Sequence, residues 1–131
     1  MIETGIHALI TQSSGFQGIA GTRLYPVLLP EEPILPAATY QRISTKALYT
    51  LDDRVNFTQV RLQIDTWAGT YSQAKDLHEA INGVLDNFSG DLPDGTHVYG
   101  IQLFTCNDLY ESEARIYRVT ADYMIQLADA L

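Results

Sequence analysis

The stretch FTQVRLQIDTWAGTYSQAKDLHEAINGVLDNF, residues 57–88, organises the rest of the chain. In its first part, apolar and polar residues alternate with the period of two that sends successive side chains to opposite faces of a β-strand. The apolar set is Val60, Leu62 and Ile64. Ala68-Gly69 interrupts the alternation, and Ser72 stands where a helix N-cap acceptor is expected. Apolar residues then recur at helical spacing, at Ala74, Leu77, Ile81, Val84, Leu85 and Phe88. The stretch predicts a strand leading into an amphipathic helix that lies across a sheet.

The composition indicates one folded domain. Of 131 residues, 46% are hydrophobic and 18% are charged, which excludes a disordered chain. A chain of this length buries roughly two-thirds of its unfolded surface, so we expect a single domain over residues 1–131 with a full core. Cys106 is the one cysteine, so an internal disulfide cannot form and a reducing cytoplasm is the simpler compartment.

Charge and hydropathy exclude several classes of partner. Sixteen acidic and eight basic residues give a formal charge of −8, which repels a phosphate backbone, so gripping nucleic acid is not expected. No apolar run approaches the ~20 residues that span a bilayer, and the start of the chain lacks the basic and apolar regions of a signal peptide. We expect a soluble protein with no membrane partner.

The first third of the chain predicts a helix, a loop and an extended arm. The helix, of about three turns, ends before Ser13 and carries its apolar stripe at Ile2, Ile6, Leu9 and Ile10. Glycines at 15, 18 and 21 then predict a loop, followed by a short extended piece at Thr22–Pro26. Prolines at 26, 30, 33 and 36 exclude a helix there. The segment YPVLLPEEPILP is therefore expected to run extended along an edge or against a neighbour.

A long hairpin comes next. Residues 38–50 and 55–67 predict two antiparallel strands, and the turn chemistry of Leu51–Arg54 joins them. Strands of about eleven residues reach roughly 36 Å, which is longer than a small core requires. Part of this hairpin is expected to project beyond the body.

A second hairpin follows the helix. Turn-forming residues at 89–96 end the helix, residues 97–106 predict a third strand, 107–111 a connection, and 114–127 a fourth strand. The order α-β-β-α-β-β predicts an α+β domain with an antiparallel-rich four-stranded sheet and two helices packed on one face. The other face is expected to stay open to contacts with other chains. It would carry Arg61, Gln63, Asp65 and Trp67.

The sequence contains no recognisable catalytic or ligand-binding pattern. His7, His78 and His97 are scattered, and one cysteine cannot complete a zinc set. The three loop glycines match neither phosphate-binding motif, and no G-x-S-x-G elbow is present. We therefore expect no enzymatic activity, no catalytic residues, no cofactor and no metal.

Three remaining features have ordinary explanations. Cys106 has no neighbouring cation in the sequence, so a buried inert thiol is expected rather than a reactive one. Asp108, Glu111 and Glu113 lack the twelve-residue calcium-loop pattern, which favours a solvated acidic connection. Trp67, at the strand-to-helix junction, is expected to be a core or interface anchor.

The order of segments along the chain carries a family resemblance. After a short helix come GTRLYP, PEEPILPAATYQRIS, VRLQIDTWAGTYSQAKDLHEAI and YESEARIYRVTADYMIQL. Together they resemble the tail completion or tail terminator proteins of long-tailed bacteriophages and related gene transfer agents. The likeness covers nearly the whole chain and is clearest at the junction around Trp67 and in the closing strand. It is looser at residues 46–55 and 88–99.

This resemblance implies a structural virion protein rather than an enzyme. Such proteins form a ring, typically of six subunits, that caps the tail tube, stops its polymerisation and presents a surface to the head connector. The implied partners are copies of itself, the tail tube protein and the head connector protein, at the head-to-tail interface of a virion assembled in the host cytoplasm. DNA would pass through the lumen without specific binding.

Candidate contact residues lie in the arm, at the hairpin tip and at the junction. They are Tyr25, Val27, Leu28, Leu29, Leu48, Tyr49, Leu51 and Trp67. Ordinary core or loop packing is the competing explanation for each. Six copies would carry about 48 negative charges, and a lumen of that sign would let DNA pass without holding it.

Two other classes of function share the predicted layout. A small-molecule-binding or enzymatic domain would have a concave pocket with convergent polar groups or a perturbed titratable residue. A cellular oligomeric adaptor would differ from the ring protein only in its partner. Flat apolar contacts between subunits would favour the ring protein or the adaptor.

Overall fold

The computed structural model describes residues 1–49 and 54–128, except for the side chains of residues 48, 49 and 54–57. Within these residues the chain forms three helices and a six-stranded sheet. In chain order the elements are α1 (Ile2–Thr11), α2 (Ser14–Ala20), β1 (Leu24–Pro26), β2 (Ala37–Tyr49), β3 (Arg54–Ala68), α3 (Tyr71–Leu85), β4 (Gly90–Asp91), β5 (His97–Glu111) and β6 (Ile116–Leu127).

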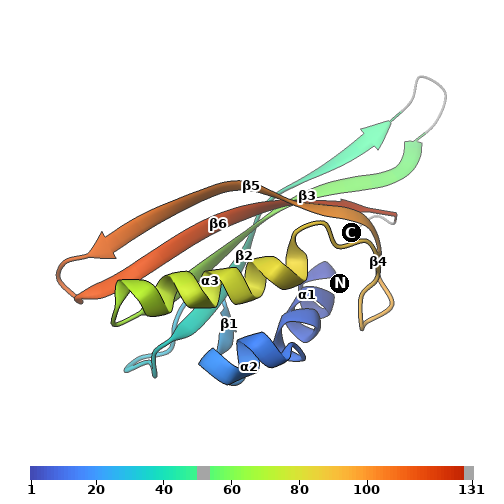
Figure 1. The fold of residues 1–131 in the computed structure, drawn as a ribbon. Helices are drawn as coiled ribbons and strands as arrows, with labels where there is room; N and C mark the ends of the chain where they lie inside the picture. Colours follow the sequence, from blue (N-terminus) through green and yellow to red (C-terminus); the bar gives the residue numbers. More distant parts are fainter. Residues whose placement is uncertain (50–53, 129–131) are drawn as a thin grey trace.

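The sheet is mixed and curls into a half-barrel, with all three helices on one face (Figure 1). Its strand order is β1-β2-β3-β6-β5-β4; β1 runs parallel to β2, and every other pair is antiparallel. The α+β class and the four long strands are confirmed. The expected numbers of four strands and two helices are wrong, because two short strands, β1 and β4, extend the edges of the sheet and a third helix, α2, packs beside the other two.

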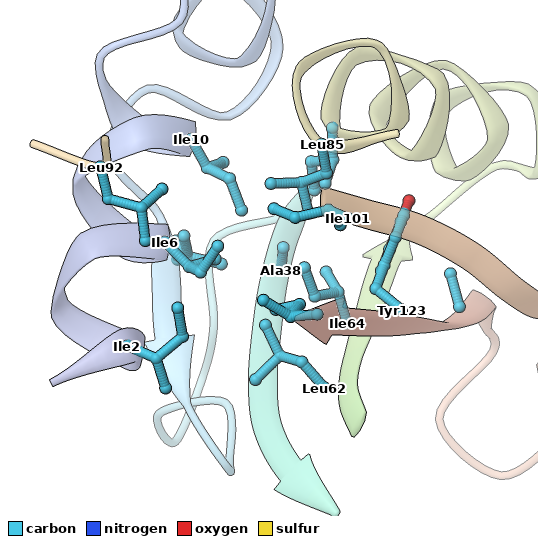
Figure 2. Close-up of a cluster of buried hydrophobic side chains, with 14 of the residues drawn as sticks. Ile2, Ile6, Ile10, Ala38, Leu62, Ile64, Leu85, Leu92, Ile101 and Tyr123 are labelled. Carbon is cyan, nitrogen blue, oxygen red and sulfur yellow. The ribbon is translucent and has the colours of Figure 1, made fainter. Parts of the chain in front are cut away.

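The core lies between β3, β6 and the helices, as the sequence predicts. Leu62 and Ile64 point from β3 toward the helices and are almost fully buried, as is Tyr123 on β6 (Figure 2). The Tyr123 hydroxyl donates a hydrogen bond to Asn82 Oδ1 on α3 at 2.9 Å, and burial raises the pKa of Tyr123 far above its ordinary value. This contact fixes α3 across the sheet.

The ends of α3 differ from those predicted. The N-cap is Thr70 and not Ser72, since Thr70 Oγ1 accepts the backbone N–H of Gln73 at 3.2 Å. That geometry satisfies one of the free donors of the first turn, and it places Ser72 inside the helix. The helix stops at Leu85, and Phe88 packs against the core from the segment beyond it.

The expected loop at the N-terminal glycines is a helix. Ser14–Ala20 forms α2, in which Phe16 and Ala20, four residues apart, are both fully buried. Burying these two side chains outweighs the weak helix propensity of the glycines, a common tertiary override. Gly21, with φ 61°, ends the helix in a conformation that suits glycine.

The second hairpin is longer than predicted. β5 continues to Glu111, where Asp108 is paired with Val119 and Tyr110 with Tyr117, so the connection expected at residues 107–111 is wrong. The turn occupies residues 112–115. In the first hairpin, β2 and β3 match the predicted strands to within one residue at each end. The turn expected at Leu51–Arg54 lies almost wholly outside the described residues.

The two hairpins extend in opposite directions. In Figure 1 the far ends of β2 and β3 reach beyond the helices on one side, and those of β5 and β6 reach beyond them on the other. One such projection was predicted; the second arises because β5 is a long strand.

Candidate assembly surfaces

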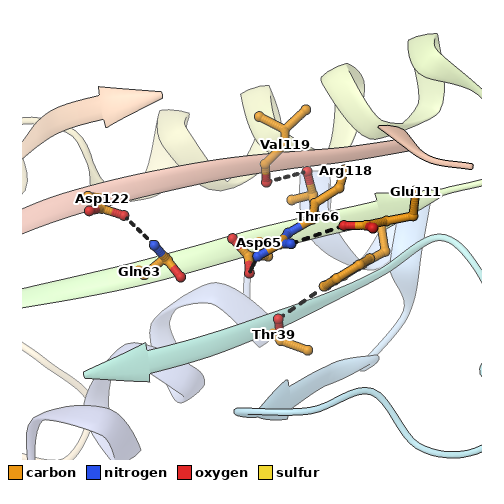
Figure 3. A network of polar contacts seen from close by, with 9 residues as sticks. Thr39, Gln63, Asp65, Thr66, Glu111, Arg118, Val119 and Asp122 are labelled. Atoms are coloured by element: carbon orange, nitrogen blue, oxygen red, sulfur yellow. Dashed lines mark hydrogen bonds and ion pairs between the residues drawn. The ribbon is translucent and has the colours of Figure 1, made fainter. Parts of the chain in front are cut away.

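The sheet face that no helix covers, called the open face here, carries a polar network. Gln63 Nε2 donates to Asp122 Oδ1 at 3.0 Å (Figure 3). Arg61 Nε donates to Asp122 Oδ2 at 2.8 Å. The Arg61 guanidinium also lies 5.0 Å from the centre of the Phe104 ring. These neighbours leave Asp122 only 5% exposed. Part of the open face is thus a paired surface that binds β3, β6 and β5 together.

Arg118 forms the second centre of the open face. Its guanidinium donates to Asp65 Oδ2 at 3.0 Å and to Glu111 Oε1 at 3.2 Å (Figure 3). It also lies 4.7 Å from the centre of the Trp67 ring, at cation–π distance. Trp67 Nε1 in turn donates to Thr39 Oγ1 at 3.2 Å. Trp67 is therefore half-buried on the open face, with its polar atom bonded inside its own chain.

The arm after β1 exposes apolar side chains. Val27 and Leu28 are 55% and 75% exposed, and Ile34, which the sequence analysis did not single out, is 69% exposed. Tyr25 and Leu29 are half-buried. Ile34 could have been found from the same proline-spaced apolar run. The arm thus exposes an apolar surface to solvent, whereas a loop packed against its own chain would bury these side chains.

The start of the arm is strained. The Leu28 N–H donates to the Pro26 carbonyl at 2.7 Å, which makes a γ-turn centred on Val27 at φ 65°. A β-branched residue rarely adopts positive φ, and such turns cost on the order of 1–3 kcal/mol. The Val27 N–H donates to the Tyr40 carbonyl at 2.9 Å, and this bond holds the turn against β2.

The remaining candidates belong to the tip of the first hairpin. The side chains of Leu48 and Tyr49 and the whole of Leu51 lie outside the described residues. Sequence reasoning missed apolar residues on the second hairpin instead. Phe104, Leu109 and Tyr110 are each between 44% and 56% exposed. Phe104 lies in the predicted strand 97–106 and was not singled out there, whereas Leu109 and Tyr110 lie in the segment that was expected to be a connection.

Titratable residues meet between α3 and β5 without forming a reactive pair. His78 Nε2 lies 3.6 Å from Cys106 Sγ. Burial lowers the pKa of His78 and desolvation raises the pKa of Cys106, so both groups are neutral near pH 7. The expectation of a buried thiol is wrong, because Cys106 is exposed. Its raised pKa nevertheless disfavours the reactive thiolate.

Two of the three acidic residues expected in a solvated connection, Asp108 and Glu111, lie in β5 and have hydrogen-bond partners, whereas Glu113 lies exposed in the turn. Asp108 accepts hydrogen bonds from the Tyr71 hydroxyl at 2.7 Å and from Lys75 Nζ at 3.2 Å, and these contacts lower the pKa of Asp108. Glu111 accepts from Arg118. Among residues 1–49 and 54–128 no group of three or more His, Cys, Asp or Glu side chains could hold a metal. No helix in the same residues is long and apolar enough to cross a membrane.

A small groove of about 190 Å³ lies between the start of α1, the end of β1 and β2. The Glu3–Arg42 ion pair lines it at 2.6 Å. Burial raises the pKa of Glu3, but the Arg42 hydrogen bonds and charge outweigh this and leave the pKa of Glu3 below its ordinary value. The groove is smaller than the roughly 300–1,000 Å³ of typical ligand pockets. It gives the small-molecule alternative little support.

The comparisons with known proteins bear on these surfaces. The family model described as Tail completion protein gp17 matches residues 4–127. The chain belongs to this tail completion family. Family membership makes it a structural, non-enzymatic virion protein of a phage or gene transfer agent, and it confirms the resemblance and the expectation of no enzyme.

A solved structure shares the fold. A chain from "Virion of native gene transfer agent (GTA) particle" superposes with a TM-score of 0.75 over 96% of this chain and 93% of that chain, at 11% sequence identity. At that identity the likeness establishes the arrangement of elements, including the curled sheet with helices on one face. A search of curated proteins gives no match.

Proposed function

We propose that the chain, acting as one unit over residues 1–131, forms a closed ring that caps the tail tube of the virion. Six copies is the number that the family resemblance implies. The ring would end tube polymerisation at the head-to-tail interface and present its other side to the head connector. Assembly would take place in the host cytoplasm and need no cofactor.

The observation that carries this proposal is apolar exposure in a chain of the tail completion family. Val27 and Leu28 stand on a strained turn that backbone hydrogen bonds hold in place. A fixed loop that presents apolar side chains loses little conformational entropy when another chain covers it. We assign Tyr25, Val27, Leu28 and Leu29 to contacts with a neighbouring copy or the tube. Leu48, Tyr49, Leu51 and Trp67 are further proposed contacts.

Charge pairing supports the passage of DNA without binding. Arg42, Arg61 and Arg118 are each engaged by a carboxylate of the same chain, at Glu3, Asp122 and Asp65. The net charge of the chain is −8, which further disfavours the holding of phosphates. A solved ring with a basic lumen would overturn this part of the proposal.

The test is assembly, measured with an arm variant. Native mass measurement of the free protein, and electron microscopy of it mixed with tubes of the tail tube protein from the same particle, should show closed rings, free or at tube ends. The double variant Val27→Asp, Leu28→Asp should stay folded, because aspartate tolerates positive φ better than valine, yet lose the rings. Gln73→Asp, on the exposed side of α3, is the matched control. Monomers alone, with bare tube ends, would contradict the proposal.

A further inference from the structure

We propose that neighbouring copies join by their sheet edges, with the free part of β2 in one copy pairing antiparallel to the free part of β5 in the next. This inference rests on the proposed ring and names the surface that builds it. The partner is a second copy of this chain. The contact is heterologous, because two different edges meet.

Both strands have uncovered edges. β1 lies beside β2 only as far as the pair Pro26 and Tyr40. β4 lies beside β5 only at His97 and Val98, and the segment after α3 then bonds to Ile101 through Asn87 and Phe88. Within the described part of the chain, no strand pairs with the outer edge of Gln41–Ala47 or of Phe104–Glu111. These two stretches, of similar length, are called the β2 edge and the β5 edge below.

Each edge has a register shift, between Arg42 and Ser44 on β2 and between Leu103 and Thr105 on β5, and charged side chains, but each lacks the other protections of strand edges. Soluble proteins blunt exposed strand edges with proline, very short strands or a covering loop. The β2 edge and the β5 edge contain no proline and expose apolar side chains. Ile43 is 44% exposed on the first, and Phe104 and Tyr110 are 56% and 51% exposed on the second. Edges of this kind accept an added strand through their unpaired backbone groups.

The charges on the two edges are complementary. Arg42 and Lys46 lie on the β2 edge, which has no acidic residue, while Asp108 and Glu111 lie on the β5 edge, which has no basic residue. Opposite charges across adjacent strands are stabilising, and like charges are destabilising. Arg42, Asp108 and Glu111 already have ion-pair partners in their own chain, at Glu3, Lys75 and Arg118. Pairing β2 with β5 still places a basic edge beside an acidic edge, whereas pairing either edge with its own kind places like charges together. This favours head-to-tail growth over a two-fold dimer.

The positions of the edges fit closure into a ring. The registers place Thr45 level with Val60, Ile125 and Ile101, and Asn107 level with Thr120, Asp65 and Thr39. The centres of the two edges are thus offset along the strands by the distance from Thr39 to Thr45. At ~3.3 Å per residue this is about 20 Å.

That offset can be compared with the width of the sheet. Four long strands at ~4.8 Å spacing occupy about 19 Å. In a closed ring all copies sit at the same height along the ring axis. The β5 edge of one copy then lies beside the β2 edge of the next only if the strands tilt from the ring axis by the angle whose tangent is the offset divided by the width, which is about 45°. Strands of closed barrels tilt by a similar angle of about 35–45°. The β2 and β5 strands run in opposite directions within one copy, so upright neighbours pair antiparallel.

The single native cysteine makes the contact testable. Cys106 lies on the β5 edge, is exposed, and pairs with Ala121 on the face that the helices cover. Thr45 and Ala47 lie on the β2 edge, and Thr45 pairs with Val60 on that same face. Thr45→Cys and Ala47→Cys, made singly, place a second thiol where the edge of the next copy would meet it. The two positions test two registers that differ by two residues.

The experiment is mild oxidation followed by denaturing electrophoresis without reductant. It is applied to free protein at high concentration and to protein bound to tail-tube ends. At least one variant should give a ladder of disulfide-linked multimers that ends at the ring size, in more than about half of the chains. Wild type and Glu79→Cys, on the exposed side of α3, should give dimers at most.

Each result separates this inference from the ring itself. Rings by electron microscopy with no ladder from either variant would overturn the edge contact and leave the ring proposal standing. A ladder equally strong in Glu79→Cys would also overturn it, since that linking would be collisional. Absence of both rings and ladders would overturn the edge contact and the ring together.

Discussion

Asp122 shows how one residue shapes the open face. A carboxylate on a sheet face without helices is normally solvated, yet Asp122 is 5% exposed because Arg61, Gln63 and the Phe104 contact of Arg61 surround it. A charge in such a place is stable only while its partners remain. Side chains of the same chain therefore cover part of the open face.

Asp122→Asn should destabilise the fold by about 1–2 kcal/mol. The asparagine keeps a hydrogen-bonding side chain but leaves the Arg61 charge without its partner, and the partial exposure of Arg61 keeps the loss below that of a fully buried pair. Urea unfolding, followed by circular dichroism, measures the change. Asp76→Asn on the exposed side of α3 should change the free energy of unfolding by less than about 0.5 kcal/mol. An equal loss in both variants would contradict the role of the network.

Glu3 gives a pH-dependent prediction. The pKa of Glu3 is below its ordinary value of 4.5 in the folded chain, so the unfolded chain binds the proton more tightly. The Glu3–Arg42 pair therefore contributes stability above about pH 4.5, and that stability is lost as the pH falls through the folded pKa. Glu3→Gln should lower the free energy of unfolding by less than about 1 kcal/mol at pH 7, and the difference from wild type should shrink toward pH 3. A difference that does not change between these pH values would contradict the assignment.

Among the helices and strands, the sequence predicts those elements whose formation depends on the local pattern of apolar and polar residues. The alternation at 60–64 and the stripe from Ala74 to Leu85 gave β3 and α3 correctly, because both are long amphipathic elements. α2 was missed because its glycines disfavour a helix in isolation and only burial of Phe16 and Ala20 stabilises it. β1 and β4 are two or three residues long and exist through pairing with distant strands.

The candidate surfaces also divide into those that local sequence predicts and those that depend on the topology of the sheet. The exposed Val27 and Leu28 could be anticipated from proline spacing, which prevents regular packing. The β5 edge could not, because Asn107 to Glu111 has a loop-like composition and becomes a strand only through its pairing with β6. Charge complementarity between two edges depends on which strands end up outermost, and that is a property of topology.

Two glycines in different helices give a matched prediction. A Cβ at Gly5 in α1 would lie 2.6 Å from Asp94 Oδ1 and 2.8 Å from Leu92 Cδ1, whereas a Cβ at Gly83 in α3 would meet nothing within 4 Å. Gly5→Ala should therefore destabilise the chain by about 1–3 kcal/mol through overpacking against the loop after β4. Gly83→Ala should stabilise it by up to about 1 kcal/mol through helix propensity.

Thermal and urea unfolding of the two variants measure this contrast. Both substitutions add the same methyl group to a helix, so a difference in sign reports the contact between α1 and residues 92–94 alone. A stabilising effect of Gly5→Ala would contradict overpacking, since it would show that residues 92–94 can move away from α1 to make room for the added methyl group.

For the whole molecule, the distribution of charge matters more than its total. The net charge of −8 opposes association of any two copies, and long-range repulsion of this kind is screened by salt. The basic β2 edge and the acidic β5 edge act against that repulsion in one relative arrangement only. In the proposed ring, self-assembly would be specific because the attraction is local and directional while the repulsion is general.

Charge reversal across the two edges tests this balance. Lys46→Glu alone and Glu111→Lys alone should each weaken ring formation, because each makes its edge less complementary in charge to the edge of the next copy. The double variant should recover part of the affinity, since the two altered positions again carry opposite charges on opposing edges. An equimolar mixture of the two single variants should also assemble, with the copies alternating. Sedimentation velocity at about 50 mM and about 1 M salt measures these affinities, and the differences should diminish at high salt. Equal weakening in the single and double variants would show that these charges do not interact across the contact between copies.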